Sequence, residues 1–166
     1  MGIKIWLKNY LKVERISCER IISGTGLSRI AEWRLSKPDA RNNPLQKYFK
    51  EIKISDVLRK KLPEKICNLS REGDQLMIEV ERIWLGADRS LLGDVALQEL
   101  CFGGLWISGG PASKPFKHFK SDLFMKQFFD KGRLKDILKT IPLKVILDEE
   151  FGLFSAACRA KMLLKT

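Results

Sequence analysis

The chain has 166 residues, of which 45 % are hydrophobic, a composition that is typical of a globular domain and excludes an intrinsically disordered chain. Lys and Arg number 31 against 20 Asp and Glu, which gives a formal net charge of +11. This excess permits a polyanionic partner, but the basic residues are scattered and no nucleic-acid-binding motif accompanies them, so we expect no nucleic-acid partner.

The cysteines and the apolar runs bear on the cellular compartment. The four cysteines, Cys18, Cys67, Cys101 and Cys158, are far apart and form no CxxC pair, so a structural zinc site is not expected. No apolar run reaches the roughly 20 residues of a membrane span, and no signal peptide is recognised. We therefore expect a reduced, cytoplasmic protein with free, buried thiols and no membrane contact.

The first third of the chain predicts helices. Apolar residues at helical spacing predict an amphipathic helix over residues 1–14. Ser17 is then expected to cap a helix of one or two turns that ends at the glycine-rich "SGTG" of residues 23–26. A second helix is expected from about Leu27.

A polar region follows these helices. Residues 36–45, "SKPDARNNPL", are rich in Pro, Asn and Asp and predict an exposed loop. Residues 46–70 are polar and prone to form helix, and Pro63 is expected to interrupt them. We interpret residues 36–70 as an insertion of loop and helix.

The next segment combines a long helix with a strand. A broad apolar face predicts one helix over residues 73–100, in which Gly86 and Gly93 indicate close packing. The stretch "GGLWISGGPA" of residues 103–112 then predicts a turn at its first glycine pair and a buried strand over residues 105–108.

The last third repeats the alternation of helix and strand. Residues 112–139 are expected to be rich in helix, residues 141–147 predict a second strand, and residues 152–164 predict a closing apolar helix. This order is typical of an α/β fold with parallel strands. Because two strands are too few for a stable sheet, part of the sheet is expected to lie outside the chain.

Common catalytic motifs are absent from the sequence. The chain has no GxSxG, HExxH or Walker A motif, and its one histidine, His118, is expected to be a surface residue of a helix. A hydrolase triad is therefore excluded.

Three stretches carry a family resemblance when they are taken together. They are "SCERIISGTGL" (17–27), "GGLWISGGPA" (103–112), and "FFDKGRLKDILKTIPLKVIL" (128–147) leading into "GLFSAA" (152–157). In this order, over residues 15–163, they resemble the bacterial glucokinases of the sugar-kinase and actin-like superfamily. The resemblance implies an α/β fold, a partial ribonuclease-H-like large domain rich in helix with two or more parallel strands.

The resemblance also implies a reaction and a set of binding residues. The reaction is ATP-dependent phosphorylation of the 6-hydroxyl of glucose, with Mg²⁺. Glu19 matches the family glutamate that accepts hydrogen bonds from sugar hydroxyls; the alternative is an ordinary acid in a first helical turn. Gly109 and Gly110 match nucleotide-side glycines, where a Cβ would block the approach of the backbone to ATP; the alternative is a strand-ending turn. Gly24 and Gly26 match a family glycine loop that lines the nucleotide side.

The chain departs from the family pattern in two respects. Ser155 replaces a family glycine in the last motif, and nothing resembles the family's N-terminal phosphate loops, sugar loop or catalytic aspartate. The resemblance therefore implies that residues 1–166 are the C-terminal half of a glucokinase, without the small domain and inactive alone. Two alternatives stay open: a truncated product or half-enzyme that needs an N-terminal partner, and a basic nucleic-acid-binding module.

Overall fold

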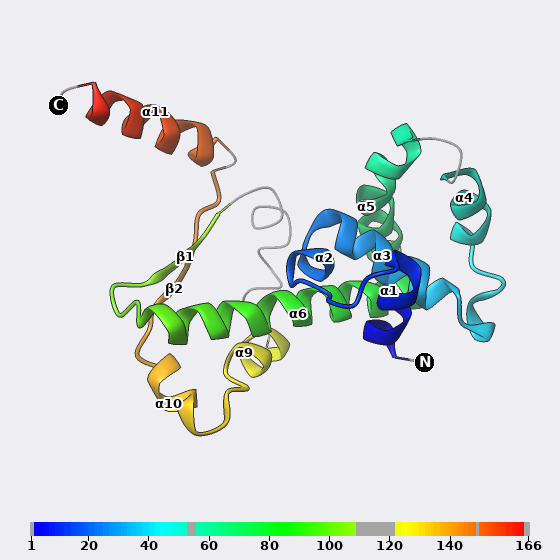
Figure 1. Cartoon of the computed structure of the whole chain (residues 1–166), viewed down its shortest axis with the longest axis horizontal. Helices are drawn as coiled ribbons and strands as arrows, with labels where there is room; N and C mark the ends of the chain where they lie inside the picture. The colour runs from blue at the N-terminus through cyan, green and yellow to red at the C-terminus, as the bar shows by residue number, and fades with distance from the viewer. Residues whose placement is uncertain (1, 53–55, 109–121, 149, 165–166) are drawn as a thin grey trace. The chain divides into compact units, whose positions relative to one another are not determined.

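The computed structural model describes residues 2–52, 56–108, 122–148 and 150–164. The chain divides into two compact units, Met1–Asp88 and Arg89–Thr166. Helix α6, Gln75–Glu99, begins in the first unit and ends in the second (Figure 1). The long helix that the apolar pattern predicts over residues 73–100 is therefore confirmed.

The first unit is helical throughout its described part (Figure 1). Besides the start of α6, its elements are α1 (Ile3–Leu11), α2 (Glu19–Ile22), α3 (Gly24–Leu35), η1 (Pro38–Ala40), α4 (Leu45–Ile52) and α5 (Asp56–Arg71). The helix expected over residues 1–14 is confirmed with narrower bounds, because Lys12 adopts a left-handed conformation with φ 52° and ends α1. The expected loop at 36–45 contains the short 3₁₀ turn η1 and ends one residue early, since Leu45 already begins α4.

The core of the first unit consists of apolar side chains that recur every three or four residues along α3, α5 and α6, together with one residue each of η1 and α4. They bury one face of each helix, since this spacing places side chains one above another. The fully or nearly buried members are Leu27, Ile30, Ala31, Leu35, Ala40, Leu45, Leu62, Ile66, Met77, Val80, Trp84 and Leu85. Each large side chain buried in this way contributes about 1.5–3 kcal/mol to folding.

Pro63 lies inside α5 and does not interrupt it, so that expectation is wrong. Leu62 and Ile66 on the same turn are 1 % and 0 % exposed, and their burial holds the helix although proline cannot donate a backbone hydrogen bond.

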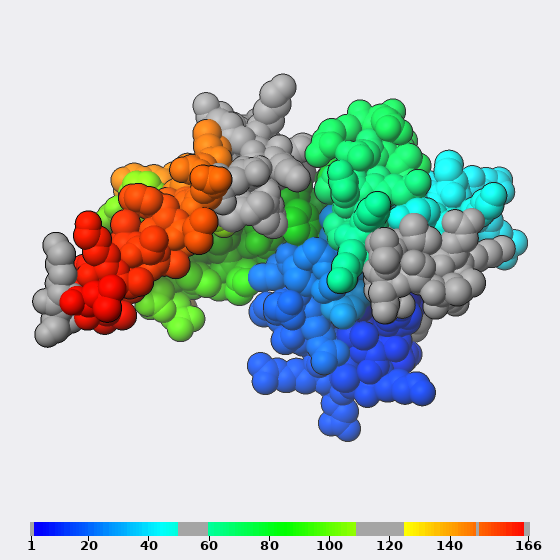
Figure 2. Space-filling view, turned by 90° about the horizontal axis from the view of Figure 1, so that it is seen from above, coloured from blue at the N-terminus to red at the C-terminus, as the bar shows by residue number. Residues whose placement is uncertain are grey.

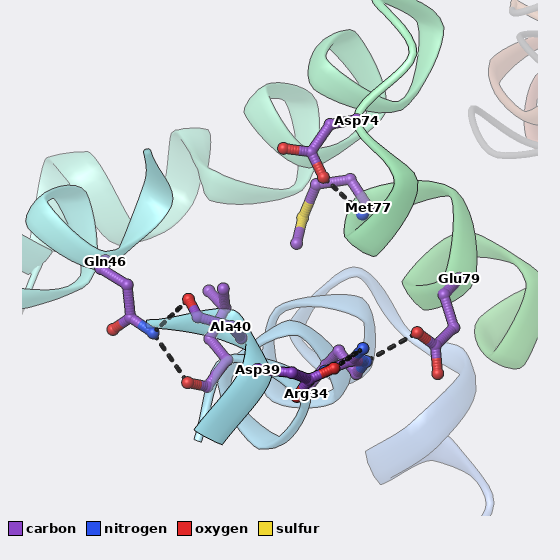
Figure 3. Close-up of polar contacts among 8 residues, drawn as sticks. Arg34, Asp39, Ala40, Gln46, Asp74, Met77 and Glu79 are labelled. Atoms are coloured by element: carbon purple, nitrogen blue, oxygen red, sulfur yellow. Dashed lines mark hydrogen bonds and ion pairs between the residues drawn. The ribbon is translucent and has the colours of Figure 1, made fainter. Parts of the chain in front are cut away.

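A three-residue ion cluster joins α3 to η1 and α6 (Figure 3). Arg34 donates from Nη1 and Nη2 to the two carboxylate oxygens of Asp39, at 3.0 and 2.8 Å, and from Nε to Glu79 Oε2 at 2.7 Å. Arg34 is only 9 % exposed. The hydrogen bonds from Arg34 hold the pKa of Asp39 below its ordinary value of 3.8, and both carboxylates raise the pKa of Arg34.

Further polar contacts fix the ends of the neighbouring helices (Figure 3). Asp74 caps α6, because its Oδ1 accepts from the backbone N–H of Met77 at 3.0 Å. Gln46 donates from Nε2 to the carbonyl oxygens of Leu35 and Ala40, at 2.7 and 3.1 Å. The backbone carbonyl groups at the end of α3 and in η1 are thus hydrogen-bonded by a side chain.

The second unit contains the two strands. Its elements after α6 are β1 (Leu105–Ile107), α9 (Asp122–Phe128), η2 (Gly132–Leu134), α10 (Lys135–Leu138), β2 (Leu143–Val145) and α11 (Phe151–Leu163). The strands lie side by side and pair in parallel, Leu105 with Leu143 and Ile107 with Val145 (Figure 1). The predicted parallel strands are confirmed, and a helix-rich unit around them is compatible with an α/β fold. The finer expectation, a ribonuclease-H-like domain, stays a prediction.

Gly93 on α6 makes the close contact that its position predicted. A Cβ at this residue would lie 2.5 Å from the carbonyl oxygen of Phe128 and 2.8 Å from Cε of Lys131. The Lys131 ammonium, on a side chain only 10 % exposed, pairs with Asp94 at 2.6 Å and donates to Ser90 Oγ at 3.1 Å. Residues 128–131 are therefore held against α6 by packing and by charge.

The strands and the last helix are less covered than the sequence predicted. The strand expected to be buried has partly exposed ends, and its central residue Trp106 is 58 % exposed. Helix α11 forms as predicted, but none of its residues is buried: Leu153 is 76 % and Phe154 is 65 % exposed. Figure 2 shows the orange-red to red side chains of α11 at the surface. Exposed apolar residues on these elements indicate a surface that a further polypeptide segment could cover.

The Arg34–Asp39 pair predicts a pH-dependent contribution to stability. Because the pKa of Asp39 is lower in the folded chain than in the unfolded one, the contribution is complete above about pH 4 and is lost as the pH falls through the folded pKa. We expect Asp39→Asn to lower the free energy of unfolding at pH 7, and the difference from the parent chain to shrink at about pH 3.

Urea unfolding at the two pH values measures this difference. Asp136→Asn is the matched control, because the pKa of Asp136 is also lowered, by Lys139, but that pair is exposed and is expected to contribute little. A difference for Asp39→Asn that is the same at both pH values would contradict the assignment.

Candidate functional site

The residues matched to the glucokinase motif "SCERIISGTGL" lie where α2 meets α3. We call residues 18–26 the elbow. Ser23, extended with ψ 169°, separates the two helices, and its Oγ accepts from the backbone N–H of Gly26 at 3.1 Å. Helix α3 therefore begins at Gly24 and not near Leu27, because Ser23 caps it. Ser17, expected as a cap, is not one: Cys18 precedes α2 and its side chain caps nothing.

Gly26 is a glycine because two backbones meet there. The residue is buried, and a Cβ on it would overlap the carbonyl oxygen of Ile21 at the end of α2. Gly24 is exposed, and a Cβ there would meet only Pro63 Cγ, at an ordinary 3.8 Å. The two glycines of "SGTG" thus differ in what they do for the fold: Gly26 lets α2 and α3 touch and Gly24 does not.

Two long-range side chains hold the elbow from α3 and α6. The indole Nε1 of Trp84 donates to the carbonyl oxygens of Ile22 and Ser23, at 3.0 and 3.1 Å. Arg29 Nη1 donates to the carbonyl oxygen of Arg20 at 3.3 Å. The four-residue helix α2 has no fully buried residue of its own, so these bonds, the Gly26 contact and the partly buried Ile21 fix its place.

Glu19 is the first residue of α2 and its side chain is exposed. Its backbone carbonyl accepts from Ser23 N–H at 3.2 Å, but its carboxylate makes no hydrogen bond or ion pair with any residue that the structure describes. A carboxylate offers about four acceptor positions, all of which are open to a ligand here. The alternative role, stabilising the positive end of a helix, is weak for a helix of four residues.

The elbow brings together three of the five residues that the sequence singled out: Glu19, Gly24 and Gly26. Their proposed ligand contacts stay predictions. Gly109 and Gly110 lie outside the described residues, as does His118.

Trp84 belongs to this site, and sequence reasoning placed it only in the apolar face of a long helix. The hydrogen-bonding requirement of a buried indole is the signal that could have identified Trp84. A buried indole needs a partner for its N–H, and few acceptors are open in a helical core except carbonyls at helix ends.

The first glycine pair of "GGLWISGGPA" is a turn into β1, as predicted. Gly104 has φ +124°, and its N–H donates to the carbonyl oxygen of Cys101 at 2.8 Å. A side chain would be strained in this conformation. The turn delivers Leu105, whose N–H donates to the carbonyl oxygen of Pro142 at 2.8 Å, into the pairing with β2.

Other candidate chemistry is limited in the described part of the chain. No three His, Cys, Asp or Glu side chains gather there into a metal site, so no Mg²⁺ ligands are assigned. No helix in the described ranges is long and apolar enough to cross a bilayer. Cys18 and Cys158 are exposed and Cys67 and Cys101 are half-buried, so the expectation of buried thiols is wrong.

Comparisons with known proteins agree on one family. A family model described as Glucokinase matches residues 2–163. The glucokinase of Synechocystis sp. is 33 % identical over 162 residues, which cover 94 % of this chain and 46 % of the relative. The glucokinases of Nostoc punctiforme and Neisseria gonorrhoeae are 32 % and 28 % identical, over 90 % and 95 % of this chain and 46 % and 43 % of theirs. The chain thus spans less than half the length of these relatives.

The two glycines of the elbow are expected to differ in how strongly substitution by alanine changes the stability of the chain. We expect Gly26→Ala to destabilise the chain by about 1–3 kcal/mol, because its Cβ forces α2 away from α3. Gly24→Ala, in the first turn of the same helix, is expected to change stability by less than about 1 kcal/mol, in either direction. Thermal unfolding followed by circular dichroism gives both values, and equal Tm values for the two variants would contradict the close contact at Gly26.

Proposed function

The chain belongs to the glucokinase family, and we propose that it carries part of the sugar site and part of the nucleotide site of an ATP-dependent glucokinase. In the proposed reaction the γ-phosphoryl group of ATP passes to the 6-hydroxyl of glucose. Mg²⁺ enters with the phosphates of ATP, as part of the substrate. Catalysis of this kind depends on positioning and electrostatics, and the elbow supplies positioning.

The observation that carries the proposal is the open carboxylate of Glu19 on a fixed elbow. Both oxygens can accept hydrogen bonds from vicinal hydroxyls of one sugar ring, and a hydrogen bond to a charged group contributes about 1.5–3 kcal/mol. Because α2 is held by Trp84 and Arg29, the backbone that carries the carboxylate does not have to be ordered when the sugar binds, and only the Glu19 side chain does. A fixed pair of acceptors distinguishes sugars by the directions of their hydroxyls.

The glycines complete the proposed site. We assign Gly109 and Gly110 to the nucleotide side, where the absence of a Cβ would let the backbone approach ATP. Gly24 and Gly26 are proposed to line the same side. For Gly26 the contact with Ile21 gives a structural reason for glycine that does not depend on a ligand.

The general base is proposed to belong to the part of the family fold that this chain does not span. The relatives are about twice as long as the aligned stretch, and no sequence motif of this chain matches the family's catalytic aspartate. The 166-residue chain alone is therefore proposed not to phosphorylate glucose. A cytoplasmic location is proposed with this function, since glucose and ATP meet there.

A second candidate is a non-catalytic product or a half that assembles with a separately encoded partner. The observation that favours it is the uncovered apolar surface of the second unit. Besides Trp106 on β1, that surface includes Leu153, Phe154, Met162 and Leu163 of α11. Reading the DNA upstream of Met1 separates the candidates, because an in-frame continuation that encodes the missing motifs would favour one intact enzyme.

A chimera tests the proposed function directly. In the chimera, this chain replaces the stretch that it matches in the Synechocystis glucokinase. We expect the chimera, and not the chain alone, to phosphorylate glucose with ATP and Mg²⁺. We expect Glu19→Gln to raise the KM for glucose roughly 10- to 100-fold, because one charged acceptor is lost, and to leave the KM for ATP unchanged.

The control for this measurement is Glu14→Gln, which neutralises another exposed acid of the first unit. It is expected to leave both KM values as they are. An unchanged glucose KM in Glu19→Gln would remove Glu19 from the sugar site, and a folded chimera without activity would count against the proposed function as a whole.

A further inference from the structure

We propose that Trp84 is a positioning residue for the sugar-binding carboxylate: its indole N–H fixes the elbow and thereby the place of Glu19. The inference rests on the proposed role of Glu19. Trp84 does not touch the sugar in this proposal. The side chains of Trp84 and Glu19 are expected to act on sugar binding as one unit.

Helix α2 cannot hold its own geometry. A helix of four residues is far shorter than one that is stable by itself, and α2 has no fully buried residue, with only Ile21 packed partly buried against the core. Its last carbonyl groups have no partner further along the helix, because the chain turns at Ser23. Among the residues that the structure describes, the Ile22 carbonyl accepts from Trp84 alone, while that of Ser23 accepts from both Leu27 N–H, at 3.0 Å, and Trp84.

The side chain of Trp84 is itself held in place. Its side chain belongs to the core of the first unit and the residue is 9 % exposed. It lies on α6, whose first turn is capped by Asp74 and which is tied to α3 through Glu79. The indole N–H therefore offers a donor from a rigid element to two consecutive carbonyls, and it fixes their position and orientation together.

Backbone hydrogen bonds connect the residues that carry these carbonyls with the first turn of α2, where Glu19 lies. Ser23 N–H donates to the carbonyl oxygen of Glu19 at 3.2 Å, and Ile22 N–H donates to that of Cys18 at 3.0 Å. Glu19 is therefore joined within one helical turn to the two residues that Trp84 holds. Loss of the indole N–H frees this turn, while the contact of Gly26 with Ile21 keeps α2 on α3. The expected result is a loosened elbow, whose backbone the sugar must order in addition to the Glu19 side chain.

The test uses Trp84→Phe in the chimera, which removes the N–H and keeps an aromatic ring. We expect the glucose KM to rise roughly tenfold, with the KM for ATP unchanged and kcat changed less than twofold. Trp33→Phe, in the C-terminal half of α3, is the matched control, since the Trp33 ring packs under Lys37 Nζ, beyond the end of that helix. Asp39→Asn, which weakens the fold at a different contact, shows whether lost stability alone raises the glucose KM.

The double variant Trp84→Phe/Glu19→Gln decides whether Trp84 acts through Glu19. If it does, the glucose KM of the double variant equals that of Glu19→Gln alone, because a carboxylate that is absent cannot be misplaced. A glucose KM that equals the product of the two single effects would overturn the inference. A normal glucose KM in Trp84→Phe, with a raised one in Glu19→Gln, would overturn the inference and leave the proposed function standing. A normal glucose KM in Glu19→Gln would overturn both.

Amide hydrogen exchange on the 166-residue chain gives a reading that does not need activity. We expect the amides of Ser23, Gly26 and Leu27 to exchange at least several-fold faster in Trp84→Phe than in Trp33→Phe. Unchanged protection of these three amides would show that the indole bond does not fix the elbow, and would overturn the inference independently of the kinetics.

Discussion

Helix α6 is tied to α3 near both ends of α3, and the first unit depends on these two attachments. Before the first turn of α3, Trp84 bonds the carbonyls of Ile22 and Ser23. In its last turn, Glu79 accepts from Arg34, which also holds Asp39. The apolar faces of the two helices supply most of the favourable free energy by burial, but burial has no direction. The polar attachments determine which carbonyl and which carboxylate lie where, and so where the elbow presents Glu19.

Close backbone contact is the second constraint, and it recurs once in each unit. The absence of a Cβ at Gly26 lets the end of α2 pack on the first turn of α3, and its absence at Gly93 lets Phe128 and Lys131 pack on α6. In both places the contact joins a short or irregular segment to a long helix. Such segments contribute little burial of their own, so a missing Cβ on the long helix is what lets them pack. Both glycines belong to parts of the chain that also carry polar attachments, at Ser23 and at Lys131.

Local pattern predicted the elements well and their environment less well. The helices over residues 1–14 and 73–100 and the parallel strands followed from periodicity and order, because those signals are repeated over many residues. Ser17 was the wrong cap and Pro63 the wrong break, since both depend on tertiary contacts that outweigh local preference. In the site, the family motif led to Glu19 and the glycines. Trp84 could not be found in that way, because its bond joins residues 61 and 62 positions apart in the chain.

The elbow is proposed here as the surface on which the sugar lies. Cys18 tests it, because the thiol is exposed and directly precedes Glu19. The measurement is the rate of alkylation of Cys18 by iodoacetamide in the chimera, read from peptide masses, with Cys158 on α11 as the internal reference. We expect saturating glucose to slow alkylation of Cys18 several-fold, and sorbitol at the same concentration to leave it unchanged. A Cys18 rate that glucose does not change relative to Cys158 would contradict the claim.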